Sequence, residues 1–259
     1  MDRGDLSDAE WELIGPLLPP ERGRHARPAG DNRRYLNGML HVLRVGCPWR
    51  DMHERYGKWN WVYVRFRRWA EQGVWDAMLQ TLVDLGLTDD WQHMIDSTTV
   101  RGHVSAVGGK GGLVRRLLVD HAAALPARHA RCDNQDLPLG FYLTGGEASD
   151  YGGVDSLMAM PVPKPAALLA DKGYDGDRFR ENLLLHNILP VIPPRSNRKA
   201  PEHPDYRRYR DRNRVERMFG FLKHQRRIAT RFEKTTLSYL SFLNIAAARL
   251  WLKHFVNAT

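Results

Sequence analysis

Residues 167–171, Ala-Leu-Leu-Ala-Asp, form a short apolar run that ends in a carboxylate. Such a run is typical of a strand that is buried on both faces of a sheet. Residues 93–96, His-Met-Ile-Asp, end in the same way. Ligand sites in open α/β sheets lie at the carboxyl ends of the strands, so the two runs predict that Asp96 and Asp171 belong to one site. Either aspartate alone is equally compatible with a helix cap.

Further strands and helices flank this stretch and predict an α/β sheet with covering helices. Strands are predicted at residues 139–143 and 188–192, and helices at residues 148–158, 178–185, 206–226 and 239–255. We expect Asp175 and Asp177 to cap the helix that begins near residue 178.

The first 90 residues carry helix signals instead of strand signals. Ser7 and Glu10 form a capping box, while Asp31 can cap a second helix that Gly46 ends. A third helix has an apolar stripe at helical spacing, made of Trp59, Val62, Phe66 and Trp69. A fourth helix is predicted at residues 74–85.

Three arginines accompany the stripe of the third helix: Arg65, Arg67 and Arg68. A stripe at helical spacing is expected to be core, so only the arginines are candidates for phosphate contacts. Short helices with a basic third member suit a helix-turn-helix DNA reader. We therefore expect a helical DNA-binding domain at residues 1–90 and a catalytic domain at residues 91–259, which ends in basic helices.

The chain of 259 residues carries a formal net charge of +9. Residues 195–234 hold 14 Lys and Arg against 5 Asp and Glu, so this segment alone carries the same excess. Cations placed on phosphates release counterions, so the charge favours a nucleic-acid partner over a basic protein without one. The two cysteines predict no disulfide framework and suit a reducing cytoplasm. We expect no signal peptide, because the N-terminus lacks a basic region followed by an apolar run, and no membrane span, because no run of about 18 apolar residues occurs.

Four polar side chains share one face of the long helix at residues 206–226: Tyr209, Arg212, Glu216 and Lys223. Their spacing keeps them within roughly a quarter of a turn. Carboxylates are the ligands that Mg²⁺ or Mn²⁺ requires, and two such ions about 4 Å apart can promote phosphodiester cleavage. Glu216 therefore joins Asp96 and Asp171 as a candidate metal ligand. Arg212 and Lys223 are candidate phosphate contacts.

The motif Tyr209-x2-Arg212-x3-Glu216-x6-Lys223 resembles the signature around the last acidic residue of bacterial insertion-sequence DDE transposases. Residues 95–98, Ile-Asp-Ser-Thr, and 170–175, Ala-Asp-Lys-Gly-Tyr-Asp, resemble the blocks around their first two acidic residues. Residues 6–11 and 46–51 are similar to the helical domain of the insertion-sequence-five group.

This resemblance implies a ribonuclease-H-like core with Asp96, Asp171 and Glu216 as catalytic residues and ligands of two Mg²⁺ or Mn²⁺ ions. It also implies a homo-oligomer that binds the inverted repeats of its element and target DNA, with cleavage followed by strand transfer. Tyr209, Arg212 and Lys223 would then support catalysis or contact DNA.

Residues 113–129 depart from the family pattern, which has a Gly-Arg-Ser-Arg-Gly-Gly segment and then a strand beside the Asp96 strand. One possible DNA sequence for residues 117–127 encodes Leu-Gly-Arg-Ser-Arg-Gly-Gly-Phe-Thr-Ser when it is read one base earlier. Two compensating frame slips would therefore convert the family segment into the present one. Residues 122–126, Ala-Ala-Ala-Leu-Pro, fit a central strand poorly. We therefore expect the Asp96 strand to lose a neighbour and catalysis to be impaired. A genuine subfamily insert is the alternative.

Two other functions are compatible with the sequence. The break at residues 113–129 favours a catalytically defective remnant or a DNA-binding regulator. A general ribonuclease-H-like nuclease is the third possibility, but the helical N-terminal region and the long basic helix count against it.

Overall fold

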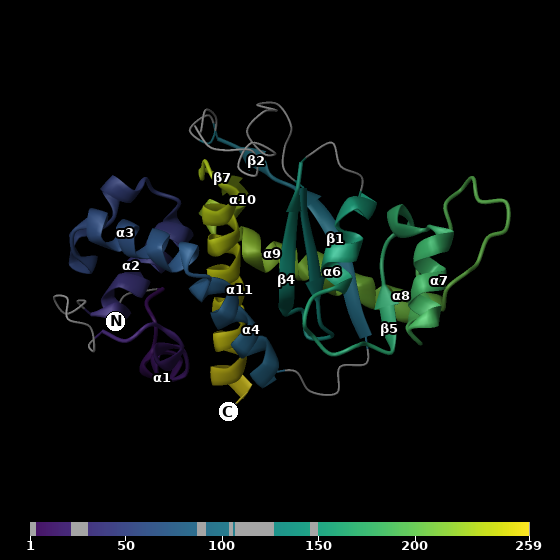
Figure 1. Ribbon diagram of the computed structural model, residues 1–259, viewed down its shortest axis with the longest axis horizontal. Coiled ribbons are helices and arrows are strands. Elements are labelled where there is room, and N and C mark those ends of the chain that lie inside the picture. Colours follow the sequence, from purple (N-terminus) through teal and green to yellow (C-terminus); the bar gives the residue numbers. More distant parts are fainter. Residues whose placement is uncertain are drawn as a thin grey trace. The chain divides into compact units, whose positions relative to one another are not determined.

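The computed structural model describes residues 4–21, 31–86, 92–103, 106, 127–145 and 150–258 (Figure 1). The chain forms two compact units. One, the helical unit, comprises Met1–Gly86, Gly102–Gly109 and Leu222–Thr259. The other, the sheet unit, comprises Leu87–Arg101 and Lys110–Phe221.

Local sequence signals set the helix ends in the helical unit. The Ser7 hydroxyl and the Glu10 carboxylate form the predicted capping box, and Asp31 accepts a hydrogen bond from the Arg34 N–H. Gly46 ends its helix with φ of 75°, which favours glycine. The elements are α1 (Asp8–Ile14), η1 (Gly15–Leu17), α2 (Asn32–Val45), η2 (Trp49–Asp51), η3 (Glu54–Tyr56), α3 (Trp59–Glu71), α4 (Val74–Gly86), α10 (Arg226–Ala229), β7 (Thr230–Arg231) and α11 (Thr236–Ala258). Strand β2 (Arg101–Gly102) pairs with β7.

Helix α11 is the core of the helical unit. Phe242 of α11 stacks on Phe66 of α3 with ring centroids 4.5 Å apart, and the Asn244 amide donates to Asp76 Oδ1 at 2.8 Å. The structure thus differs from the expected division at residue 90, because residues 222–259 pack with the N-terminal helices. The apolar surface of α11 finds its partners far away in the sequence, which no local pattern reveals.

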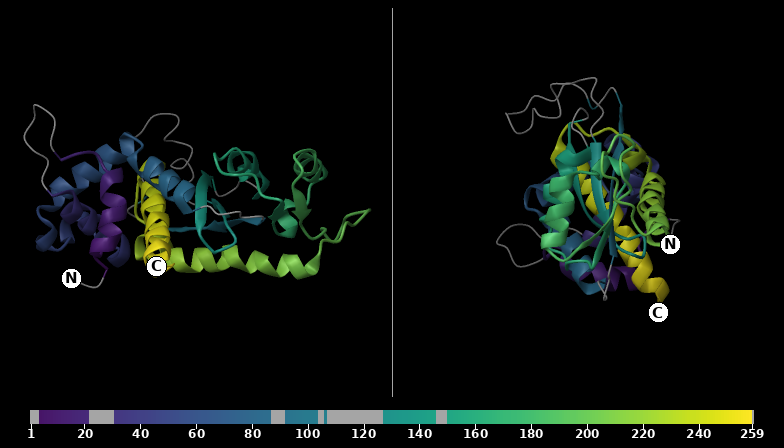
Figure 2. Two further views of the ribbon diagram at one scale, coloured as in Figure 1. Left: turned by 90° about the horizontal axis from the view of Figure 1, so that it is seen from below. Right: turned by 90° about the vertical axis from the view of Figure 1, so that its right-hand side faces the viewer.

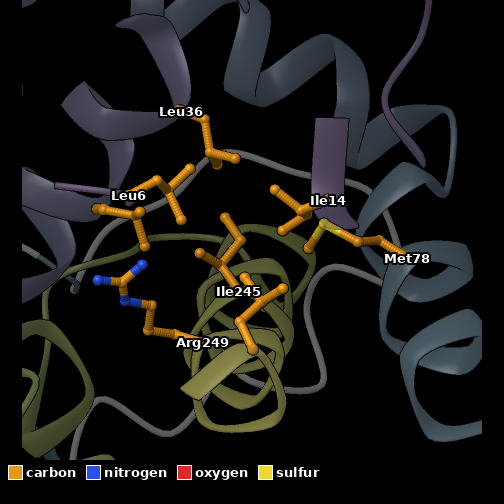
Figure 3. A pocket seen from close by; sticks show the side chains of 8 residues that line it. Leu6, Ile14, Leu36, Met78, Ile245 and Arg249 are labelled. Carbon is orange, nitrogen blue, oxygen red and sulfur yellow. The ribbon is translucent and has the colours of Figure 1, made fainter. Parts of the chain in front are cut away.

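A small gap between α1, α2, α4 and α11 is lined mostly by apolar side chains (Figure 3). Its lining residues are Leu6, Ile14, Leu36, Leu40, Met78, Ile245, Arg249 and Leu252. The Arg249 guanidinium is engaged, since it donates to Glu10 Oε2 at 2.7 Å and to the Asp5 carbonyl at 3.2 Å. We interpret this gap as a packing feature of the core.

The sheet unit contains a mixed five-stranded sheet in the order β4-β3-β1-β5-β6. Strands β1, β5 and β6 are parallel, and β3 is antiparallel to both β1 and β4. The strands are β1 (Gln92–Thr99), β3 (Ala127–Cys132), β4 (Pro138–Thr144), β5 (Ala167–Leu169) and β6 (Leu189–Val191). The helical elements are η5 (Asp150–Gly153), α6 (Val154–Met158), η6 (Lys172–Tyr174), α7 (Asp177–Leu185), α8 (Tyr206–Tyr209), η7 (Arg210–Arg212) and α9 (Asn213–Lys223). The predicted helix start at residues 148–149 lies outside the described residues.

Side-chain alternation gives β1 two different faces. Ile95 packs in the apolar cluster that includes Leu157 of α6 and Phe179 of α7. On the opposite face, the Gln92 amide donates to Asp211 Oδ2 of η7 at 2.9 Å. Figure 2 (left) shows α8 to α9 along one side of the strands and α6 and α7 along the other. Asp96, an even-numbered position, therefore faces the long helix.

The Asp96 strand keeps its antiparallel neighbour, so the expected loss of that strand is wrong. β3 pairs with β1 from Met94↔Cys132 to Thr99↔Ala127. All six β3 residues are buried, and they start at residue 127, after the alanines and the proline that disfavour a strand. Residues 113–126 lie outside the described residues.

Candidate active site

The three predicted carboxylates come from three elements of the sheet unit. Asp96 lies within β1, which continues to Thr99, so the strand does not end at Asp96 as expected. Asp171 follows β5 and caps η6, with its Oδ1 accepting the Gly173 N–H at 2.8 Å. Glu216 lies in the first turn of α9. Strand β5 is parallel to β1, so Asp171 follows a strand that runs beside the Asp96 strand.

Arg212 links two of the three carboxylates, those of Asp96 and Glu216. Its Nη1 donates to Asp96 Oδ2 at 3.2 Å, and its Nη2 donates to Glu216 Oε1. The guanidinium carbon also lies 6.0 Å from the centroid of the Tyr209 ring. The structure thus brings together Asp96, Tyr209, Arg212 and Glu216, although η7 interrupts the single α-helix that the sequence predicts.

Burial and charge raise the pKa of the Asp96 carboxyl to about 6. Desolvation is the main cause, and the negative charges of Asp171 and Glu216 add to it, whereas the Ser97 N–H and Arg212 oppose it. Burial also raises the pKa of Tyr209, with Asp171 and Asp96 adding to the rise. Asp171 and Glu216 therefore lie close enough to Asp96 to influence its pKa, as groups that converge on one site do.

The donor chemistry of this site fits a hard divalent cation. Its candidate ligands are carboxylate oxygens, which Mg²⁺ and Mn²⁺ prefer, and two of the carboxylates already pair with a cationic group, the Arg212 guanidinium. Within the part of the chain that the structure describes, no group of three or more acidic, His or Cys side chains is arranged so that it could hold a metal ion. Asp96 and Glu216 would have to exchange Arg212 for the metal.

The other predicted side chains lie in the helical unit. Arg65 donates to Asn32 and stacks 4.6 Å from the Tyr35 ring centroid, so packing engages its guanidinium. Arg67 pairs with Glu71 at 2.9 Å. Arg68 is exposed on α3, and Lys223 is exposed at the end of α9. Of the three arginines, Arg68 is the one whose placement suits a phosphate contact.

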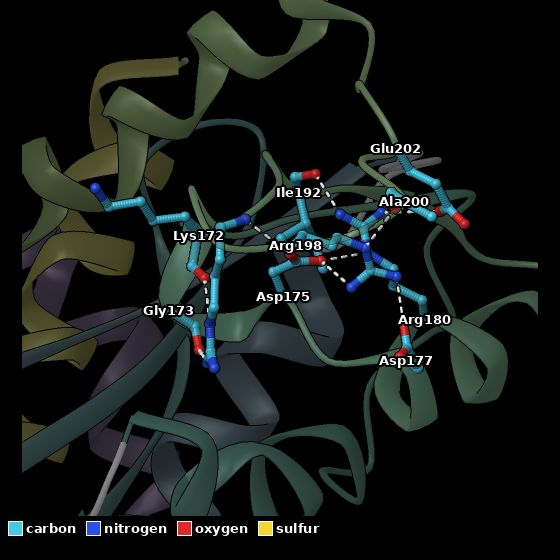
Figure 4. Close-up of polar contacts among 10 residues, drawn as sticks. Lys172, Gly173, Asp175, Asp177, Arg180, Ile192, Arg198, Ala200 and Glu202 are labelled. Atoms are coloured by element: carbon cyan, nitrogen blue, oxygen red, sulfur yellow. Dashed lines mark hydrogen bonds and ion pairs between the residues drawn. The ribbon is translucent and has the colours of Figure 1, made fainter.

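Asp175 does not cap α7 as expected. Gly176 is the N-cap residue and makes no side-chain cap bond, while Asp177 is the first residue of the helix. The Asp175 carboxylate is buried and binds Arg180 and Arg198 instead (Figure 4). The spacing of Asp175 and Arg180 is a weak local signal for this pair, but Arg198 comes from a distant segment.

Family models match two parts of the chain. "Putative transposase of IS4/5 family" matches residues 6–79, and "Transposase DDE domain" matches residues 168–253. A Brucella ovis protein named "Putative transposase for insertion sequence element IS6501" is 35% identical over 129 residues, which are 48% of this chain and 96% of that protein. The chain belongs to the IS4/5 family of transposases.

The chain is also similar to a second bacterial protein and to a solved structure. An uncharacterized protein of Sinorhizobium fredii is 40% identical over 125 residues, which are 46% of this chain and 96% of that protein. A solved structure of the piggyBac transposase in a synaptic complex with hairpin DNA has a TM-score of 0.54 and 12% identity, over 96% of this chain and 71% of that chain. This likeness supports a shared fold, and the DDE domain implies the use of divalent metal ions. No helix within the described ranges is long and apolar enough to cross a membrane.

Proposed function

We propose that this IS4/5 family member binds the ends of its insertion sequence and cleaves and transfers DNA strands at a ribonuclease-H-like core. The observation that supports this most directly is the link from Asp96 through Arg212 to Glu216, next to Asp171. Strand-borne and helix-borne carboxylates thus converge from positions far apart in the chain. The protein would act in the bacterial cytoplasm as a homo-oligomer that holds two DNA ends.

Asp96, Asp171 and Glu216 would hold two Mg²⁺ or Mn²⁺ ions. When bound, such ions activate the attacking oxygen and stabilise the leaving oxygen of a phosphodiester. Arg212, released from the carboxylates, can bind a backbone phosphate through its planar fork. Tyr209 lies beside Arg212 and can limit the rotation of the guanidinium.

The helical unit would hold the DNA outside the cleavage site. Helix α3 exposes Arg68 together with Trp61, whose ring lies 5.4 Å from Lys58 Nζ. Cations with an exposed aromatic ring suit a phosphate backbone and the groove beside it. Lys223 offers a further exposed cation at the end of α9.

The test is end cleavage in Mg²⁺ by purified variants. Glu216→Gln, Asp96→Asn and Asp171→Asn should each abolish cleavage and leave DNA-end affinity, measured by gel shift, nearly unchanged. Glu181→Gln, which removes an exposed carboxylate from α7, should cleave like the unaltered chain. Full cleavage by any of the three site variants contradicts the catalytic assignment.

A defective remnant or a DNA-binding regulator is the second candidate, because residues 113–129 depart from the family pattern. It predicts that the chain binds element ends without cleaving them. Cleavage is therefore compared between this chain and a version with Leu-Gly-Arg-Ser-Arg-Gly-Gly-Phe-Thr-Ser restored. Recovery in the restored version alone supports the remnant, and equal cleavage supports a tolerated insert.

A further inference from the structure

Asp175 anchors the segment that follows β6. Its Oδ1 accepts from Arg180 Nε at 2.7 Å and from Arg198 Nη1 at 2.9 Å, and its Oδ2 accepts the Arg195 N–H at 2.8 Å. The Asp175 side chain is 1% exposed and that of Arg180 is 5% exposed. A buried carboxylate with three donors is a strong and directional anchor. The backbone at Arg195 is thereby fixed against the start of α7.

A second set of bonds holds the same segment near Ile192 (Figure 4). Arg180 Nη2 donates to the Ile192 carbonyl at 2.7 Å, and Arg198 Nη2 contacts Asp177. The segment is thus tied on both sides of Arg195. The backbone position from which the Arg195 side chain extends is therefore set by Asp175 and Arg180.

The Arg195 guanidinium reaches back to the turn that follows Asp171. Its Nε donates to the Lys172 carbonyl at 3.1 Å, and its Nη2 donates to the Gly173 carbonyl at 2.5 Å. The N–H of Gly173 in turn donates to Asp171 Oδ1 at 2.8 Å. The turn at residues 172–173 therefore accepts two hydrogen bonds from Arg195 through its backbone carbonyls and donates one to Asp171 through a backbone N–H.

We infer that Arg195, held in place by Asp175, is a positioning residue that sets the Asp171 carboxylate for metal binding. This rests on the proposed function, because it gives Asp171 a metal to bind. Oδ1 is occupied by Gly173, so the rotation of the carboxylate is fixed and Oδ2 is the oxygen offered to the ion. Partners that orient a metal ligand typically affect metal affinity or activity by about 10- to 100-fold.

The experiment measures Mn²⁺ affinity of the full chain without DNA by calorimetry, and the Mg²⁺ concentration that gives half-maximal end cleavage. Arg195→Ala is the test variant, since Arg195 is exposed and its loss should not unfold the sheet. Lys199→Ala is the matched control, because it removes another exposed cation from the same segment. Arg195→Lys keeps the charge but lacks the planar guanidinium that donates to two carbonyls at once.

Arg195→Ala should weaken Mn²⁺ binding about tenfold or more and raise the half-maximal Mg²⁺ concentration by a similar factor. Cleavage should recover at high metal, Arg195→Lys should be intermediate, and Lys199→Ala should match the unaltered chain. If Arg195→Ala and Lys199→Ala instead weaken DNA binding equally and leave Mn²⁺ affinity unchanged, the inference is overturned.

Asp171→Asn separates this inference from the proposed function. If Asp171→Asn retains Mn²⁺ binding and cleavage, both the proposed function and the inference fail. If it loses both while Arg195→Ala retains Mn²⁺ affinity, only the positioning role of Arg195 is rejected.

Discussion

His93→Asn tests the two-faced arrangement of β1 that aims Asp96 at the long helix. The His93 side chain is fully buried on the face opposite Asp96. Its Nδ1 accepts from Arg131 Nε at 3.0 Å, and Arg131 Nη1 donates to the Leu157 carbonyl of α6 at 3.1 Å. Burial, helped by the Arg131 charge, lowers the pKa of His93 from 6.5 to about 3. The imidazole is therefore neutral in the folded chain.

The sign of the pH effect follows from proton binding. Between pH 6.5 and pH 3, His93 binds a proton in the unfolded chain but not in the folded chain. Its contribution to stability is complete above pH 6.5 and is lost as the pH falls toward 3. Each pH unit in this window costs about 1.4 kcal/mol, so the free energy of unfolding should fall by about 2 kcal/mol from pH 7 to pH 5 on account of His93.

The assay is urea unfolding of the unaltered chain and of His93→Asn at pH 7 and pH 5. The amide oxygen of the introduced asparagine can accept from Arg131 but does not titrate, so the variant should lose about 2 kcal/mol less between the two pH values. At pH 7 it should be less stable by roughly 0.5–3 kcal/mol, because part of a buried ring is missing. An identical pH dependence in both proteins would refute the burial of His93 beside Arg131.

Two further predictions concern the helical unit. Arg68→Ala should weaken DNA binding and reduce the slope of log affinity against log salt concentration by about one unit, measured by fluorescence anisotropy at several salt concentrations. Arg65→Ala should mainly lower stability. An unchanged slope for Arg68→Ala would exclude a phosphate contact. Gly86→Ala should lower the free energy of unfolding by about 1–3 kcal/mol in a urea titration, because a Cβ there would lie 2.2 Å from Trp251 Cζ3. Gly102→Ala, where a Cβ meets nothing within 4 Å, is the control, and equal stability of the two variants would contradict this packing.

Features with a local cause could be predicted from the sequence. The capping box of Ser7 and Glu10 and the left-handed Gly46 depend on a few neighbouring residues, and the structure confirms both. The α/β sheet was also predictable, because apolar runs of strand length alternate with helical patterns. The family resemblance to insertion-sequence transposases is confirmed by the comparisons.

Features that depend on distant partners could not be predicted. The stripe of α3 indicated a core face, but nothing nearby shows that Arg65 would turn to Asn32 and Tyr35. Asp175 looked like a helix cap because its partner Arg198 lies 23 residues away. The departure of residues 113–129 from the family pattern and the poor strand composition of residues 122–126 predict the loss of a strand, but β3 begins directly after them at Ala127.

The pairing of Asp96 with Ala130 has a consequence for how mutations in this gene are tolerated. Strand positions obey parity: one codon gained or lost inside β1 exchanges Asp96 with a core neighbour and turns the carboxylate into the apolar cluster. Codons gained or lost between residue 103 and residue 127 leave the parity of both strands intact, whatever their number. The side of β1 that carries Asp96 is therefore sensitive to single-residue insertions and deletions within the strand, whereas changes in chain length outside the two paired strands do not turn Asp96 toward the core.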